Sequence, residues 1–346
     1  MNKLAVVLAF AFATGAVHAQ PAATPPAPSG PAPTGVVVGS GNFYSPIVAN
    51  LEEAIRFYRD GIGFEFMGEP ANADANPQLR AMFGLPDAKL RYQIGRAPGI
   101  QGGVEIIEIS AAGGDRLNLT MRDPGSVMLA VVVRDIDQTL ARVKALGAPV
   151  VTSSGNPVAI KEAGLRAVVV KDPAGHFVQL LQPDNPPPTQ RGTGDIRNVR
   201  VRHTVENLDR AVALYRDALG LQGGVVPINP QTSPPVADSL GVPASTQWRY
   251  TQLIVPTSGL PVELIEFKGA RRPAPPDIAD PGATRIQLRV ADIDAAAAAL
   301  VQAGGTFIST GGKPLDLPAG NRSLKVGVVR DPDGWFIVLI DTPPTQ

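Results

Sequence analysis

The sequence predicts an α+β protein in which four βαβββ units form two open-barrel domains of similar size. Two observations lead to this prediction. The first is an internal repeat: "NLEEAIRFYRDGIGF" (Asn50 to Phe64) aligns without gaps with "NLDRAVALYRDALGL" (Asn207 to Leu221), with seven identities in fifteen. The second is that each half holds two copies of one pattern, in which an apolar strand, a capped helix and several more strands follow one another.

The repeat continues along both halves at a nearly constant spacing. "VEIIE" (Val104 to Glu108) returns as "VELIE" (Val262 to Glu266), and "KDPAGHFVQLL" (Lys171 to Leu181) returns as "RDPDGWFIVLI" (Arg330 to Ile340). The second pair predicts a type I turn at Asp-Pro-x-Gly that leads into an apolar strand. We therefore expect one domain at 36–182, with units 36–122 and 123–182, and another at 196–343, with units 196–279 and 280–343.

The second unit illustrates how each element is predicted. The β-rich run "VMLAVVV" at 127–133 predicts a strand, and Asp135 with Gln138 predicts the capped start of a helix that ends at Gly147. An apolar stripe of Ile136, Leu140 and Val143 would face the core. Asn50 caps the equivalent helix of the first unit in the same way.

The N-terminus has the pattern of a signal peptide at 1–19. Lys3 precedes the apolar run 4–13, which is too short to span a membrane, and Val17-His18-Ala19 fits a cleavage site. We expect export to the periplasm or secretion after cleavage near Ala19. A Pro-rich segment at 20–35 cannot bury apolar area and should be an extended, disordered tether. A second linker, at 183–195, divides the remaining chain into two nearly equal halves. The chain has no Cys, so its stability must come from its cores.

The overall charge argues against polyanionic partners. Lys and Arg number 31, as do Asp and Glu, so the formal net charge is zero. This balance speaks against nucleic acid and acidic membrane surfaces. We expect a small-molecule ligand, no nucleic acid and no membrane span, with the two domains packed on each other.

These motifs resemble those of the vicinal oxygen chelate superfamily, the group of glyoxalases, bleomycin-resistance proteins and extradiol dioxygenases. The matching stretches are "NLEEAIRFYRDGIGF", "VELIEF", "VADIDAAAAALVQAGG" and "DPDGWFIVLID", and the resemblance extends from about Val36 to Thr342. It implies that two units pair around one concave cavity. In metal-using members, the first and last strand of each unit supply four ligands to a divalent ion, which chelates two vicinal oxygens of the substrate.

The positions that the resemblance assigns to metal ligands carry other residue types. Domain one would present Phe43, Glu105, Met128 and Gln179, and domain two would present Arg200, Glu263, Arg285 and Val338. Arginine cannot ligate a cation, and Phe and Val have no donor atoms. We therefore predict no metal and no other cofactor, unless the ligand alignment is wrong by a residue.

Two interpretations of the cavity expected in domain two (196–343) remain open. Arg200, Arg202, Arg285, Gln287 and Arg289 would alternate onto one inner face opposite Glu263. These side chains could bind an anion, or they could be ion pairs that fill a cavity without function. Domain one suits an apolar ligand, with Glu105 as a hydrogen-bonding edge or general base. His203 should face away from the cavity, and His176 should lie at the surface or rim.

Three functions follow as hypotheses. The first is an exported protein that binds a small organic molecule without metal, as in the bleomycin-resistance branch. The alternative is an enzyme, a glyoxalase-like lyase or isomerase or a dioxygenase-type enzyme, with a divergent metal site or with Glu105 or Glu263 as base. The third is a structural protein with vestigial cavities. The sequence does not name a substrate.

Overall fold

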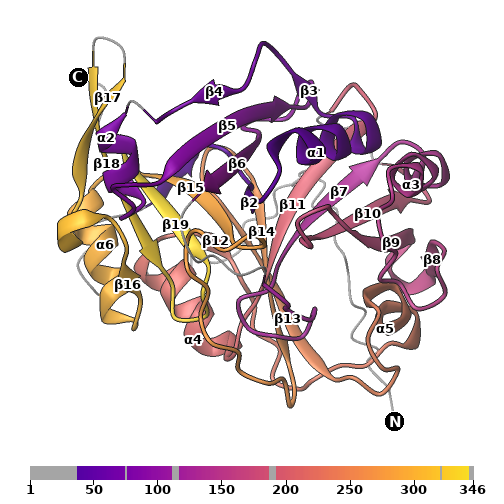
Figure 1. Ribbon diagram of the computed structural model, residues 1–346. Coiled ribbons are helices and arrows are strands. Elements are labelled where there is room, and N and C mark those ends of the chain that lie inside the picture. Colours follow the sequence, from indigo (N-terminus) through magenta and orange to yellow (C-terminus); the bar gives the residue numbers. More distant parts are fainter. Residues whose placement is uncertain (1–36, 75, 111–116, 187–191, 320–321, 343–346) are drawn as a thin grey trace, which may run out of the picture.

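A computed structural model describes residues 37–342 except 75, 111–116, 187–191 and 320–321 (Figure 1). The expected signal peptide and tether, and part of the expected linker, lie outside the described residues. Within the described part, no helix is long and apolar enough to cross a membrane.

The described residues form two mixed sheets with helices packed on them, which confirms the α+β class (Figure 1). The larger sheet has eleven strands: β1 (Val37–Ser40), β2 (Ser45–Val48), β3 (Glu65–Phe66), β4 (Ala71–Asn72), β5 (Lys89–Arg96), β6 (Val104–Ser110), β15 (Thr284–Val290), β16 (Thr306–Phe307), β17 (Leu315–Ala319), β18 (Arg322–Arg330) and β19 (Phe336–Asp341). The smaller sheet has eight: β7 (Val127–Val133), β8 (Val158–Ile160), β9 (Leu165–Lys171), β10 (Phe177–Pro183), β11 (Ile196–Thr204), β12 (Gln222–Gly223), β13 (Trp248–Ile254) and β14 (Pro261–Phe267).

The sheets combine units from opposite halves of the sequence. In the smaller sheet the order β12-β13-β14-β11-β7-β10-β9-β8 joins unit three to unit two through their first strands, β11 and β7. In the larger sheet, β2 of unit one pairs with β15 of unit four, and Ser45 lies opposite Arg285. The expectation that the two units of one half share a cavity is therefore wrong. Unit one shares its sheet with unit four, and unit two with unit three.

The two helices whose caps the sequence predicts begin at those caps. Asn50 and Asp135 accept hydrogen bonds from the N–H groups of Glu53 and Gln138, at 3.0 Å and 2.9 Å. The helices are α1 (Leu51–Arg56) continuing into the π-helix η1 (Phe57–Ile62), α2 (Pro77–Met82), α3 (Ile136–Ala145), η2 (Lys161–Ala163), α4 (Leu208–Val212) continuing into η3 (Ala213–Ala218), α5 (Pro234–Leu240), α6 (Ile293–Gln302) and η4 (Thr310–Gly312). Gly63 closes η1 with a φ of 105°, a left-handed conformation that favours glycine.

Each half uses a strand glutamate to hold the start of its first helix. Glu108 accepts the N–H of Leu51 at 2.9 Å, and Glu266 accepts that of Leu208 at 2.7 Å. The repeated Arg91 and Arg249 pair with the same two glutamates. Both glutamates are thus engaged outside the cavities, where their negative charges stabilise the helix starts and the repeated arginines pair with them.

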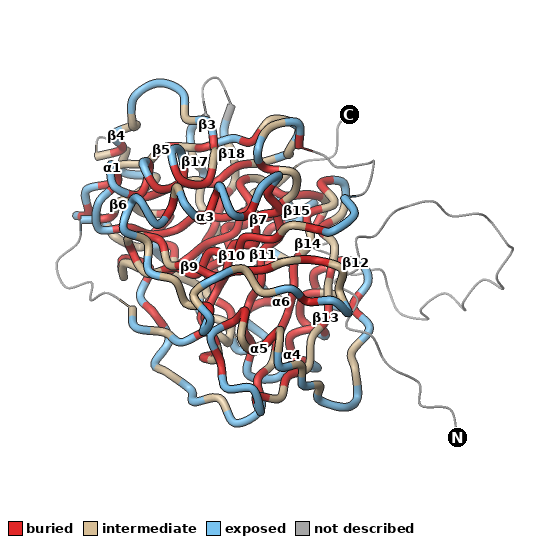
Figure 2. Tube along the Cα trace, turned by 90° about the vertical axis from the view of Figure 1, so that its right-hand side faces the viewer, coloured by how far each residue is buried: buried red, intermediate tan, exposed pale blue. Residues whose placement is uncertain are grey.

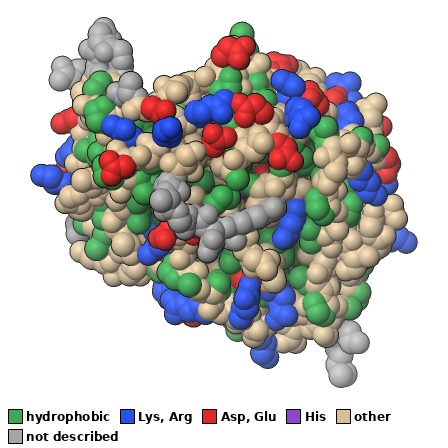
Figure 3. Space-filling model, viewed as in Figure 1, with side chains coloured by type: hydrophobic (Ala, Val, Ile, Leu, Met, Phe, Trp, Pro, Cys, Tyr) green, Lys and Arg blue, Asp and Glu red, His purple; other side chains and the backbone are tan. Residues whose placement is uncertain are grey.

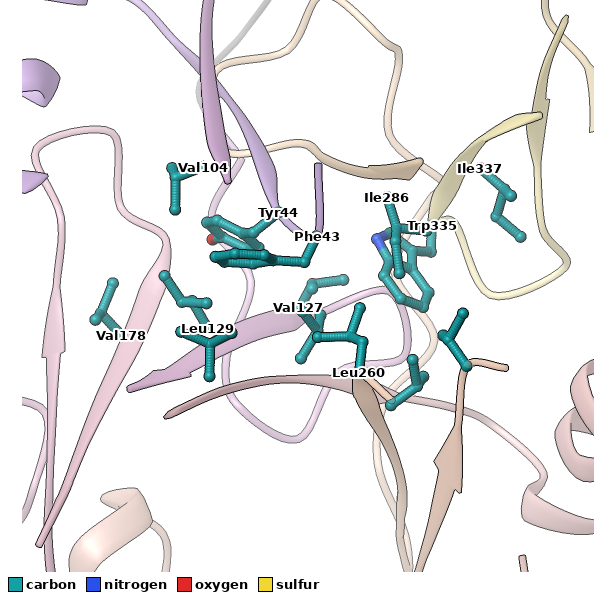
Figure 4. Packing of buried hydrophobic residues seen from close by; sticks show 14 of the residues in the cluster. Phe43, Tyr44, Val104, Val127, Leu129, Val178, Leu260, Ile286, Trp335 and Ile337 are labelled. Carbon is teal, nitrogen blue, oxygen red and sulfur yellow. The ribbon is translucent and has the colours of Figure 1, made fainter. Parts of the chain in front are cut away.

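One apolar core joins the two sheets. Its residues come from all four units, and Figure 4 shows Phe43, Leu129, Leu260 and Trp335 among them. Two further clusters line the concave faces of the sheets, one for each sheet. The central strands carry most of the buried residues, whereas helix surfaces and loops are exposed (Figure 2). A shared core of this kind fixes the two cavities relative to each other.

Candidate functional site

A cavity of about 220 Å³ lies on the concave face of the larger sheet, between units one and four. Most of its wall is apolar, and one end is polar. The lining residues are Leu79, Met82, Phe83, Leu90, Tyr92, Ile94, Glu105, Ile107, Arg285, Gln287, Leu317, Leu324, Val326, Val338 and Ile340. An apolar cavity with a few convergent polar groups is the usual form of a small-molecule site.

Glu105 is the centre of the polar end. Its Oε2 accepts hydrogen bonds from Ser45 Oγ at 3.3 Å, Arg285 Nη2 at 3.0 Å and Gln287 Nε2 at 2.9 Å. From the described residues, Oε1 accepts none, and the Glu105 side chain keeps 12% of its surface exposed. One carboxylate oxygen is therefore held in place while the other is available to the cavity.

Arg285 lies almost fully buried beneath this carboxylate. Its guanidinium carbon is 4.6 Å from the ring centroid of Phe83, and its Nε has no hydrogen-bond partner among the described residues. Burial lowers the pKa of Arg285, and the charge of Glu105 opposes that shift. The ring face and the carboxylate together compensate a desolvated cation.

The smaller sheet carries the repeat-related counterpart of this site. Glu263, fully buried, accepts Arg200 Nη1 at 3.0 Å and Arg202 Nε at 2.9 Å through separate oxygens. Burial alone would raise the pKa of Glu263, but the charges of Arg202 and Arg200 hold it below its ordinary value. The Tyr250 ring lies under Arg202, with 5.8 Å from the guanidinium carbon to the ring centroid.

Apolar side chains seal this second group from solvent. Met128, Phe177 and Trp248 pack together on the concave face, and helix α5 adds Val236, Ala237 and Leu240. Gln179 is 1% exposed, and its Oε1 has no partner among the described residues. The arrangement is that of a packed core around a buried ion cluster, with Glu263 held by two arginines.

Each site combines residues that the sequence analysis assigned to two different cavities. Glu105 of domain one meets Arg285 and Gln287 of domain two, and Val338 lines the same cavity. In the other sheet, Met128 and Gln179 lie with Arg200, Arg202 and Glu263. The reason is the unit pairing, which joins strands from opposite halves.

Two further predictions of position are wrong. Phe43 packs in the shared core (Figure 4), because the first strand faces the cavity with Ser45 instead. Its ring centroid lies 6.3 Å from that of Phe64. Arg289 is exposed at the end of β15, although it has the same parity as Arg285 and Gln287. The five side chains predicted to bind an anion are thus divided among two cavities and the surface.

A pair of buried networks forms at the repeated Asp-Pro-x-Gly turns. Asp172 Oδ2 lies 3.0 Å from Tyr58 Oη and 2.8 Å from His176 Nδ1. His176 Nε2 is 3.1 Å from the carbonyl oxygen of Ala283 in unit four, so the prediction of a surface or rim position is wrong. The Asp-Pro-x-Gly motif predicts only a hairpin. Nothing in the sequence pattern indicates that the side chain of Asp172 contacts Tyr58.

The second turn holds an equivalent network with a different histidine. Asp331 Oδ2 accepts Tyr215 Oη at 2.6 Å and lies 3.0 Å from His203 Nε2. The charge of Asp331 raises the pKa of His203 against the effect of burial, and His203 lowers that of Asp331. His203 lies on the strand face away from Glu263, as predicted.

Asp333 lies close to this pair, so the three side chains have the spacing of a metal cluster. The carboxylates are engaged elsewhere: Trp335 donates its N–H to Asp331 Oδ1, and Arg210 and the Glu206 N–H both donate to Asp333 Oδ1. We therefore regard His203, Asp331 and Asp333 as structural.

Comparison with known proteins agrees with this geometry. Two family models, both described as Glyoxalase/Bleomycin resistance protein/Dioxygenase superfamily, match residues 43–180 and 200–321. Comparison with curated proteins yields no match.

Similar solved structures include glyoxalase I from Zea mays, with 15% identity and a TM-score of 0.57, covering 89% of this chain and 92% of that chain. A mutant of the same Zea mays enzyme has 15% identity and a TM-score of 0.56, covering 89% of this chain and 94% of that chain. At this identity the likeness concerns the fold alone. Both sequence halves match the same family, and the chain is a tandem member of the glyoxalase, bleomycin-resistance and dioxygenase superfamily.

Proposed function

We propose that the protein binds a small, largely apolar organic molecule in the cavity between units one and four. The observation that carries this proposal is the cavity of about 220 Å³ with an apolar wall and the Glu105–Arg285–Gln287 group at one end. The sealed Glu263 group of the other sheet offers no comparable opening at its carboxylate, which is fully buried. We therefore assign ligand binding to the larger sheet.

The polar end of the cavity indicates which polar group the ligand carries. Glu105 and Arg285 neutralise each other, so no net charge has to be balanced by the ligand. Oε1 of Glu105 is an acceptor without a protein donor in the described residues, and a ligand hydroxyl or amide N–H would satisfy it. The ligand class is an apolar molecule with one hydrogen-bond donor at its edge.

We further propose that binding requires no divalent metal. Arg285 places a guanidinium where a ligand would be needed, and Val338 has no donor atom. A cation bound to Oε1 of Glu105 would lie close to the guanidinium of Arg285 and would meet its positive charge. Metal content after dialysis tests this: a stoichiometric tightly bound divalent ion would contradict it, as would loss of ligand binding in EDTA.

The second candidate is an enzyme in which Glu105 acts as general base. The observation in its favour is that the two carboxylate oxygens of Glu105 are bonded differently. Three donors hold Oε2 in place, whereas Oε1 is available to accept a proton from a substrate. A substrate proton next to a carbonyl group could then pass to Oε1. Turnover that survives unchanged in Glu105→Gln would remove this role.

We also propose that the chain is exported, because 1–19 has the charge, apolar length and small-residue end of a signal peptide. N-terminal sequencing of protein recovered from the periplasm or medium should begin near Gln20. A start at Met1 would contradict export by cleavage.

A thermal-shift screen of neutral aromatic and alicyclic alcohols and amides tests the binding proposal. Hits should raise the melting temperature, and Val338→Phe, which fills the cavity, should abolish their effect. Glu105→Gln should weaken binding of donors at least severalfold. The exposed Glu53→Gln serves as the matched control and should bind as the wild type does. No hit, or hits that Val338→Phe leaves unchanged, would overturn the proposal.

A further inference from the structure

A second cavity, of about 210 Å³, lies outside both concave faces. It forms where the loop before β7, at the junction of units one and two, meets the turn before β13 and the end of β14, both from unit three. Five of its six lining residues carry polar side chains, namely Arg122, Ser245, Thr246, Gln247 and Lys268, and the sixth is Pro243. None of these residues belongs to the ligand cavity proposed above.

Thr246 indicates that this cavity is built for a polar occupant. The residue is 6% exposed, and its Oγ1 is buried without a hydrogen-bond partner among the described residues. A buried hydroxyl normally has a partner, because leaving it unpaired is costly. Since Thr246 lines the cavity, an occupant with an acceptor oxygen would provide the missing partner.

Arg122 is anchored through one of its three nitrogens. Its Nη2 donates to the carbonyl oxygens of Lys268 at 3.1 Å and Gly269 at 3.4 Å, which anchor the guanidinium to the end of β14. Its Nε is buried and has no partner among the described residues. The side chain thus keeps donors at Nε and Nη1 that the anchoring bonds do not use.

The charge around the cavity is positive. Lys268 is exposed and makes no ion pair with a described residue, and no carboxylate belongs to the lining. Asp123, next to Arg122, is engaged by Arg271, whose Nη2 lies 2.8 Å from Asp123 Oδ2. Two cations therefore share the cavity without a carboxylate in its wall to offset them. Figure 3 shows that Lys and Arg are interspersed with Asp and Glu over much of the visible face.

We propose that this cavity binds a tetrahedral oxyanion, either inorganic phosphate or the phosphate group of a small ester. Arg122 Nε, Thr246 Oγ1 and the Lys268 ammonium supply three donors of different type, which suits separate oxygens of one anion. A carboxylate would prefer the paired donors of a guanidinium edge, but Arg122 uses Nη2 on the backbone. The site combines the loop between units one and two with unit three, and an anion would stabilise the contact between them.

Calorimetric titration of the full chain with inorganic phosphate, at constant ionic strength, tests the proposal. We expect saturable binding of one phosphate per chain. Thr246→Val keeps the shape of the side chain but removes its hydroxyl, and it should weaken binding at least fivefold. Lys268→Gln should weaken it at least tenfold. Glycerol phosphate and acetate form two further arms: tighter binding of the ester would identify an organic phosphate as the source, and acetate should bind at least tenfold more weakly.

Lys313→Gln is the matched control, since Lys313 is an exposed lysine in unit four, away from this cavity. It should bind phosphate as the wild type does. Absence of saturable phosphate binding would overturn the proposal, as would equal weakening by Lys268→Gln and Lys313→Gln, which would indicate a nonspecific charge effect. Binding of acetate as tight as that of phosphate would refute the tetrahedral specificity.

Discussion

At the residue scale, the two repeat-related glutamates show how one position takes two roles. Glu105 has one arginine, a glutamine and a serine around one oxygen, and keeps part of its surface in the cavity. Glu263 has two arginines on separate oxygens and no exposed surface. The first can interact with a ligand, whereas the second already has its partners and holds two buried cations.

This difference predicts unequal costs of neutralising the two side chains. Glu263→Gln leaves two buried arginines without their counter-charge and should lower the free energy of unfolding by about 3 kcal/mol or more. Glu105→Gln should cost about 1–2 kcal/mol, because one arginine is affected and the amide still accepts hydrogen bonds. Urea unfolding of both variants measures this difference. Equal costs would contradict the assignment of Glu263 to structure and Glu105 to ligand binding.

The His203–Asp331 pair predicts a dependence of stability on pH. Because the folded state raises the pKa of His203 above 6.5, its contribution is complete below about pH 6.5 and is lost as pH rises through the folded pKa. Because the folded state lowers the pKa of Asp331 below 3.8, its contribution is present above about pH 3.8 and is lost as pH falls through the folded value. Tyr215 and Asp333 also face the pair.

The comparison of wild type with His203→Gln isolates the histidine contribution. The difference in unfolding free energy between the two proteins should be largest between about pH 4 and 6.5 and should shrink above that range. Urea unfolding from pH 4 to 9 provides the measurement. A difference that stays constant with pH would show that folding does not shift the pKa of His203, and would contradict the prediction.

At the element scale, the π-helices η1 and η3 pack differently against their neighbours. Gly61 in η1 approaches α3 so closely that an added Cβ would lie 2.9 Å from Cγ1 of Val143 and 3.2 Å from Cδ1 of Leu146. The repeat places Ala218 of η3 at the position of Gly61. Because Gly61 has no Cβ, η1 can lie directly against the larger side chains of α3.

Gly61→Ala should therefore destabilise the protein, by about 1–3 kcal/mol from overpacking, although alanine is the better helix former. The matched substitution, Ala218→Gly, removes a methyl group without introducing a clash and should cost about 1 kcal/mol. Thermal unfolding of the two variants checks the order. A stabilised Gly61→Ala protein would mean that α3 moves freely to accommodate the methyl group.

At the scale of the whole molecule, the sequence predicted the units but not how they pair. Periodicity and caps locate strands and helices within a unit, and the repeat locates the units themselves. The pairing of β2 with β15 involves strands far apart in the sequence, and the local pattern of either strand fits several partners. Glu105 could be identified by its repeated motif. The sequence could not show that Arg285 pairs with Glu105, because this contact depends on the pairing of β2 with β15.

Strand alternation also fails to predict the orientation of two single side chains, those of Phe43 and Arg289. Phe43 and Ser45 have the same parity, so alternation could not decide which of them faces the cavity. Arg289 also satisfies the alternation and lies opposite Ile340, which lines the cavity, but the Arg289 side chain is exposed. These errors concern where a strand enters and leaves a concave face, which depends on sheet curvature rather than on residue pattern.

Pairing across the halves makes a last prediction about the intact chain. If a protease site is inserted in the 183–195 linker and cut, the two halves should remain together, because each sheet contains strands from both. They should co-elute in gel filtration at micromolar concentration and separate only in denaturant. Half 36–182 expressed alone lacks Arg285 and Gln287 and should not bind ligands of the Glu105 cavity. Separation of the cut halves in native buffer, or ligand binding by the isolated half, would instead favour pairing of units within each half. In an isolated half, β2 and β7 would lose the partner strands β15 and β11, and their exposed edges should cause self-association. Light scattering would detect it.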